Sequence, residues 1–108
     1  MVKRSKKMSD IFAESANTTR TYSAFFEADD VVGWYYLVMK PDEPDSKIIC
    51  AMQIMHGIPD FAESDLDVRW TDDDMKVGVF IKSKLYGYYD LNSWRSVPGI
   101  YPSKPLEW

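Results

Sequence analysis

Between Thr21 and Leu91 the chain alternates short stretches of aromatic and β-branched residues with clusters of Asp, Pro, Gly, Asn and Ser. This rhythm is typical of strands separated by turns. Strands that follow one another through short polar loops usually pair with their neighbours. We therefore expect a mainly β fold, a five- to six-stranded antiparallel meander sheet with one short helix at most, and an α+β fold as the alternative. The expected strands are Tyr22–Glu27, Val32–Met39, Ile48–His56, Leu66–Thr71, Met75–Ile81 and Tyr86–Leu91.

A chain of 108 residues corresponds to one domain, which can fold without a metal or a disulfide. Residues 1–19 are expected to form a basic N-terminal arm, with a short helix at 9–16. Residues 20–96 are expected to form the antiparallel β domain. Residues 97–108 contain three prolines. They are therefore expected to form an extended tail, because proline disfavours both a helix and an inner strand.

One expected strand, Val32–Met39, is apolar on both faces. Trp34 and Tyr36 point to one side, whereas Tyr35 and Leu37 point to the other. Such a strand needs cover on both sides, from a second sheet layer, from the N-terminal segment or from a partner chain. A homodimer joined through sheet edges or aromatic faces and a monomer both remain open.

Charge is the global property that bears most on function. Lys3, Arg4, Lys6 and Lys7 give the start of the chain +4, whereas the other residues have 9 basic and 17 acidic side chains, a net charge of −8. An acidic body repels nucleic acid and attracts a basic protein. The lone Cys50 excludes an intramolecular disulfide and favours a reducing compartment. We expect a cytoplasmic protein without a cofactor and without a nucleic-acid or membrane partner.

His56 is the one histidine, so a histidine-dependent hydrolase mechanism would have to use it. Cys50 is six residues earlier, about 20 Å along an extended strand at about 3.3 Å per residue. That separation excludes direct proton transfer between the two side chains. We therefore expect His56 to be structural, and we assign no catalytic residue.

The densest acidic zone follows His56. Asp72, Asp73 and Asp74 are adjacent in one expected turn. Adjacent side chains in a turn point in divergent directions, which argues against a metal site there. Carboxylates that lie close together can instead steer and bind Lys- and Arg-rich protein. The candidate binding residues in this zone are Asp60, Phe61, Glu63, Asp65, Asp67, Asp72, Asp73 and Asp74.

Aromatic residues enrich the C-terminal third. Tyr86, Tyr88 and Trp94 are candidates for a protein interface or for core packing. A base-stacking platform would need basic neighbours, and the net charge of −8 outside the N-terminal arm argues against one.

The layout from Phe26 to Leu91 resembles a small bacterial family of unknown function. The matching segments are Phe26-Glu-Ala-Asp-Asp30, Trp34-Tyr-Tyr36, Val68-Arg-Trp70 and Tyr88-Tyr-Asp-Leu91. In size and charge the chain is also similar to the immunity proteins of bacterial toxin systems, which neutralise a toxin by binding it. The resemblance implies no catalytic residue.

The first functional hypothesis is a non-enzymatic acidic protein-binding domain, in one form an immunity protein that masks a basic toxin. The alternative is a self-associating structural or regulatory domain of unknown ligand. The third is a small hydrolase that uses His56.

Overall fold

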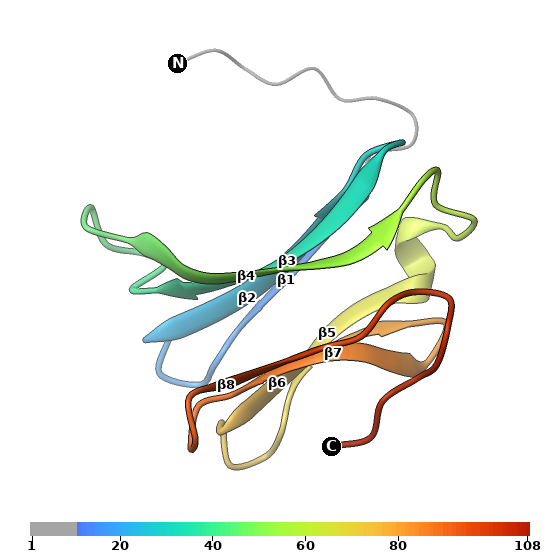
Figure 1. The fold of residues 1–108 in the computed structure, drawn as a ribbon. Helices are drawn as coiled ribbons and strands as arrows, with labels where there is room; N and C mark the ends of the chain where they lie inside the picture. The colour runs from blue at the N-terminus through green and yellow to red at the C-terminus, as the bar shows by residue number, and fades with distance from the viewer. Residues whose placement is uncertain (1–10) are drawn as a thin grey trace.

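The computed structural model describes residues 11–108, which form eight strands and one short 3-10 helix (Figure 1). The strands are β1 Ile11–Ala16, β2 Tyr22–Ala28, β3 Val32–Met39, β4 Lys47–His56, β5 Leu66–Trp70, β6 Lys76–Ile81, β7 Lys84–Asp90 and β8 Arg95–Pro98. The 3-10 helix η1, Glu63–Asp65, lies between β4 and β5.

The strands form two four-stranded antiparallel sheets, each with its strands in sequence order. We call β1–β4 sheet 1 and β5–β8 sheet 2. The two sheets lie one above the other in Figure 1, and the connection from β4 to β5 joins them. The prediction of a mainly antiparallel β fold is confirmed.

The prediction of one sheet with five to six strands is wrong. The spacing of strands along a sequence does not reveal which two consecutive strands are not hydrogen-bonded to each other. In this fold those two strands are β4 and β5. Each sheet has an apolar inner face, and two such faces are buried when the sheets stack.

Two strands differ from the prediction, β1 at the start of the described residues and β8 near their end. The helix expected at 9–16 is strand β1 over the described part of that range, because Ile11 faces the core while Phe12 and Glu14 are exposed. This alternation has the period of a strand. The tail expected from residue 97 includes the end of edge strand β8, where Val97 pairs with Tyr88. The basic arm of Lys3–Lys7 lies outside the described residues.

The core lies between the sheets. Tyr35 of β3 and Tyr89 of β7 stack there with ring centroids 4.9 Å apart. The Tyr35 hydroxyl donates to the Val77 carbonyl at 3.0 Å, and the Tyr89 hydroxyl donates to the Tyr35 carbonyl at 2.5 Å. Each sheet therefore sends one tyrosine hydroxyl to the backbone of the other.

The C-terminal segment after β8 covers part of the outer face of sheet 2. The Leu106 amide donates to the Leu85 carbonyl at 2.8 Å. The Trp108 ring packs edge-on against Phe80 and Tyr88, with centroid distances of 5.4 and 6.0 Å. No helix within residues 11–108 has the length and apolar character needed to cross a membrane.

Candidate functional site

Four aromatic side chains lie on the outer face of sheet 1, away from the core. We call them the aromatic face: Phe12, Phe25, Trp34 and Tyr36. The ring centroids are 5.6 Å apart for Phe12 and Phe25, 4.6 Å for Phe25 and Tyr36, and 6.4 Å for Trp34 and Tyr36. Phe12 is 48% exposed, and the other three are partly exposed.

The strand period explains why these rings are on the outside. In β2 and β3, Ala24, Phe26, Tyr35 and Leu37 point inward and are buried. Their neighbours Phe25, Trp34 and Tyr36 must then point outward. The predicted second apolar face of Val32–Met39 is therefore confirmed, and sheet 2 covers the inward one.

Two carboxylates share the outer face with the rings. Glu27 is the cross-strand partner of both Phe12 and Trp34, and Glu14 is the partner of Phe25. The sequences of β1–β4 contain one lysine, Lys47 at the start of β4, and no arginine. Two carboxylates therefore lie beside the aromatic face. No lysine or arginine lies in the middle of strands β1–β4.

The candidate acidic residues do not form one patch. Asp60, Glu63 and Asp65 precede β5, whereas Asp72, Asp73 and Asp74 follow it. The two ends of this five-residue strand are about 13 Å apart at about 3.3 Å per residue. The structure therefore separates the predicted acidic zone into two groups at opposite ends of β5.

The first group makes local hydrogen bonds within the fold. Glu63 accepts the Phe12 amide at 3.0 Å, and Asp65 accepts the Ala62 amide at 3.0 Å. Asp60 accepts the Tyr101 hydroxyl at 2.5 Å, and this hydrogen bond lowers the pKa of the Asp60 carboxyl.

The second group organises the turn between β5 and β6. Asp73 accepts the Thr71 hydroxyl at 2.6 Å and the Met75 amide at 3.1 Å, which lowers the pKa of its carboxyl. Asp74 accepts the Thr18 amide at 2.9 Å, so it joins this turn to the β1–β2 turn. Within residues 11–108, no three His, Cys, Asp or Glu side chains come together as a metal site.

The remaining candidates differ in exposure. Phe61, Tyr86 and Tyr88 are buried, and Phe61 and Tyr86 both pack edge-on against Tyr101. Trp94 is 62% exposed at the turn before β8. Of the predicted aromatic candidates, Trp94 is therefore the accessible one.

His56 is exposed at the end of β4, where its ring contacts the Gln53 side-chain amide at 2.6 Å. Gln53 is an amide and supplies neither a nucleophile nor a carboxylate. The geometry of this contact provides no pair of groups for acid–base or nucleophilic chemistry.

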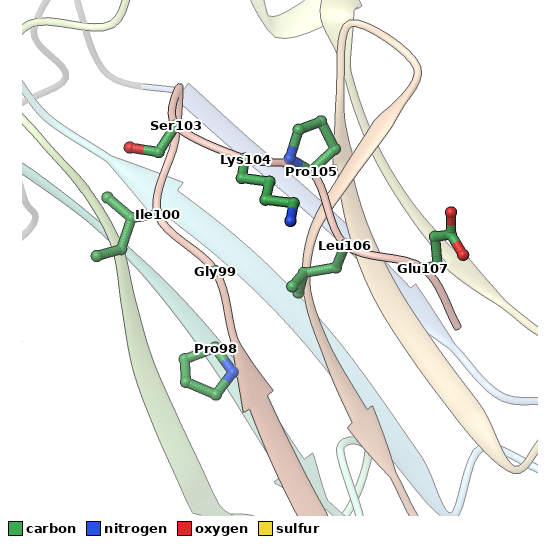
Figure 2. A pocket seen from close by; sticks show the side chains of 8 residues that line it. All are labelled: Pro98, Gly99, Ile100, Ser103, Lys104, Pro105, Leu106 and Glu107. Atoms are coloured by element: carbon green, nitrogen blue, oxygen red, sulfur yellow. The ribbon is translucent and has the colours of Figure 1, made fainter.

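A pocket of about 680 Å³ lies within the C-terminal segment (Figure 2). One arm of the segment contributes Pro98–Ile100 and the returning arm contributes Ser103–Glu107. The Lys104 and Leu106 side chains lie between the arms in Figure 2, and Glu107 points away. Among residues 11–108, those that line this pocket include one ammonium group, of Lys104, and one carboxylate, of Glu107, but no histidine or cysteine.

No known family model matches the chain, and it has no match among curated proteins or solved structures. The candidate site therefore depends on geometry. Trp34 and Tyr36 were predicted to share one strand face, but they were not among the predicted site residues. Phe12 was not predicted either, although the alternation of Ile11 and Ala13 with Phe12 and Glu14 is typical of a strand.

Proposed function

We propose that this chain is a non-enzymatic acidic protein-binding domain whose aromatic face docks a basic protein. The observation that carries the proposal is the contiguous group of solvent-facing rings across β1, β2 and β3. Contiguous exposed apolar patches mark interaction sites, and aromatic side chains contribute much of the energy at protein interfaces.

The charge of the folded part supports a basic partner. Without Asp10 and the four basic residues before it, 16 acidic and 9 basic side chains remain, a net charge of −7 for residues 11–108. A field of this sign speeds the encounter with a positively charged protein and slows the approach of a negatively charged one. Masking of a basic toxin, as by an immunity protein, is the form of binding that we propose.

Self-association is the second candidate, because an aromatic face can also pack against a copy of itself. Each copy has a net charge of −7 over residues 11–108, and like charges brought together in an interface are unfavourable. The charge pattern therefore favours a basic partner over a second copy.

A peptide selection tests the proposal and does not require the partner to be identified first. Random 12-residue peptides displayed on phage are selected on the folded chain at low salt, and the enriched peptides are then measured against variants. We expect enrichment of peptides with a net positive charge. Replacing Phe25 with alanine should weaken their binding by about tenfold or more, because central aromatic residues of interfaces contribute about 2 kcal/mol or more.

The matched control is another exposed aromatic residue. Trp94 is more exposed than the rings of the aromatic face, and it lies at the β7–β8 turn, where its ring contacts Tyr22. Trp94→Ala should leave peptide binding unchanged, whereas Trp34→Ala should weaken it. Enrichment of neutral or acidic peptides, or equal loss of binding in both variants, would contradict the proposal. Thermal unfolding of each variant verifies that it is folded.

A further inference from the structure

A pocket of about 460 Å³ lies between the β6–β7 hairpin and the C-terminal segment. Its volume is within the range of about 300–1,000 Å³ that is usual for small-molecule sites. Phe80 and Leu85 line it from the hairpin, and Leu106 and Trp108 line it from the C-terminal segment. These four side chains give the pocket mainly apolar walls, two of which are aromatic.

Contacts within the chain hold these walls in place. A β-carbon at Gly78 would lie 2.8 Å from the Trp108 ring, so the indole packs closely on β6 because Gly78 has no side chain. The ring lies edge-on to Phe80, with the centroids 5.4 Å apart. The Leu106 amide donates to the Leu85 carbonyl at 2.8 Å. The apolar part of the pocket is therefore formed before any ligand enters.

Lys84 supplies the positive charge of the pocket. Its side chain is exposed, and within residues 11–108 the ammonium makes no hydrogen bond or ion pair. Its flexible four-carbon stem allows the ammonium to reach a group at the pocket mouth. Ser83, also in the lining, adds a hydroxyl. The one carboxylate in the described lining belongs to Glu107, whose side chain points away from the arms of the C-terminal segment in Figure 2.

The turn that positions Ser83 and Lys84 has an unusual sequence for its backbone. Lys82 and Ser83 form the two-residue connection between β6 and β7, and their φ angles are 53° and 70°. Asn and Gly are the residues that favour such a turn. Side chains other than glycine in this conformation are more frequent at functional sites. The backbone of this turn therefore supports a binding role for the residues that it presents.

We propose that this pocket binds a small aromatic carboxylate. The aromatic ring of the ligand packs against Phe80, Leu106 and Trp108. Its carboxylate accepts charge-assisted hydrogen bonds from the Lys84 ammonium and a hydrogen bond from the Ser83 hydroxyl. This inference goes beyond the proposed function, because the pocket lies on sheet 2 and the aromatic face lies on sheet 1.

Two small probes of equal size test this inference by NMR titration of the isotopically labelled chain. The first is 3-phenylpropanoate, and the second is its neutral amide, 3-phenylpropanamide. We expect a dissociation constant of about 1–5 mM for the carboxylate, which is typical of a probe with about 11 non-hydrogen atoms. The amide should bind about fivefold more weakly, because it cannot form an ion pair with Lys84. The shifts should move at the Phe80, Leu85 and Leu106 amides and at the Trp108 indole N–H.

Two lysine variants separate the pocket from general charge attraction. Lys84→Gln should remove the preference for the carboxylate over the amide. The matched control Lys82→Gln removes the same charge from the same turn, but Lys82 does not line this pocket. It should therefore leave the preference unchanged. Trp108→Ala should weaken both probes, because it removes an aromatic wall, and thermal unfolding verifies that each variant is folded.

The contrary results are equally specific. Equal affinity of the two probes for the original chain, or an equal loss of preference in Lys84→Gln and Lys82→Gln, would overturn the inference. Shifts that do not saturate, or that occur away from Phe80 and Trp108, would also overturn it. None of these results alters the expected binding of basic peptides to sheet 1, which the phage selection decides independently.

Discussion

Tyr35 and Tyr89 lie in different sheets, and each donates its hydroxyl hydrogen bond to a backbone carbonyl of the opposite sheet. Both side chains are almost completely buried, and burial raises the pKa of each hydroxyl. Tyr89→Phe removes the donor and leaves the Tyr35 carbonyl without this partner. We expect a loss of about 1–2 kcal/mol in the free energy of unfolding, measured by urea denaturation. Tyr22→Phe, a half-buried tyrosine outside this pair, is the control and should cost less.

The raised pKa of these tyrosines also sets the sign of the alkaline response. Their hydroxyls ionise near pH 10 in the unfolded chain and at higher pH in the folded protein. The unfolded chain therefore loses protons first, and stability falls as the pH rises above about 10. Tyr89→Phe should make this decline shallower above about pH 10. If the free energy of unfolding of Tyr89→Phe fell with pH at the same slope as that of the original chain, the Tyr89 pKa would be the same in the folded and unfolded states, which contradicts this prediction.

At the scale of elements, the C-terminal segment stabilises sheet 2 from outside. Trp108 packs on Phe80 and Tyr88, and it lies close above Gly78, where a β-carbon would be 2.8 Å from the indole ring. Because Trp108 remains 39% exposed, we expect Trp108→Ala to cost about 1–2 kcal/mol, less than the loss of a fully buried tryptophan. Glu107→Ala, an exposed neighbour, should change the unfolding free energy by less than about 0.5 kcal/mol.

The elements also show how far the sequence could predict this fold. The central strands were predicted because alternation and turn residues mark them clearly, and in β6 the alternate residues Val77, Val79 and Ile81 are all buried. The helix prediction is wrong for β1 because a segment this short does not distinguish the period of a helix from that of a strand. β8 was missed because Pro98 argued against a strand, although an edge strand tolerates proline at its end.

At the scale of the whole molecule, the division into two sheets determines which surfaces are available. Sequence spacing alone placed Asp65, Asp67 and Asp72 in one acidic zone, but Asp65 and Asp67 lie at the start of β5 whereas Asp72 follows its end. The aromatic face depends on register between β1, β2 and β3, which local sequence does not specify. The candidate site could therefore be recognised only after distant segments were paired.

The position of a bound basic peptide tests the central claim most directly. Backbone amide chemical shifts of the isotopically labelled chain are recorded by NMR while the most strongly enriched phage peptide is added at low salt. The account predicts that shifts move in β1, β2 and β3 around Phe12, Phe25 and Trp34. The amide chemical shifts of the Asp72–Asp74 turn and of Tyr88 should not change. Perturbations confined to that turn, to Asp60–Asp67 or to the outer face of sheet 2 would contradict the account.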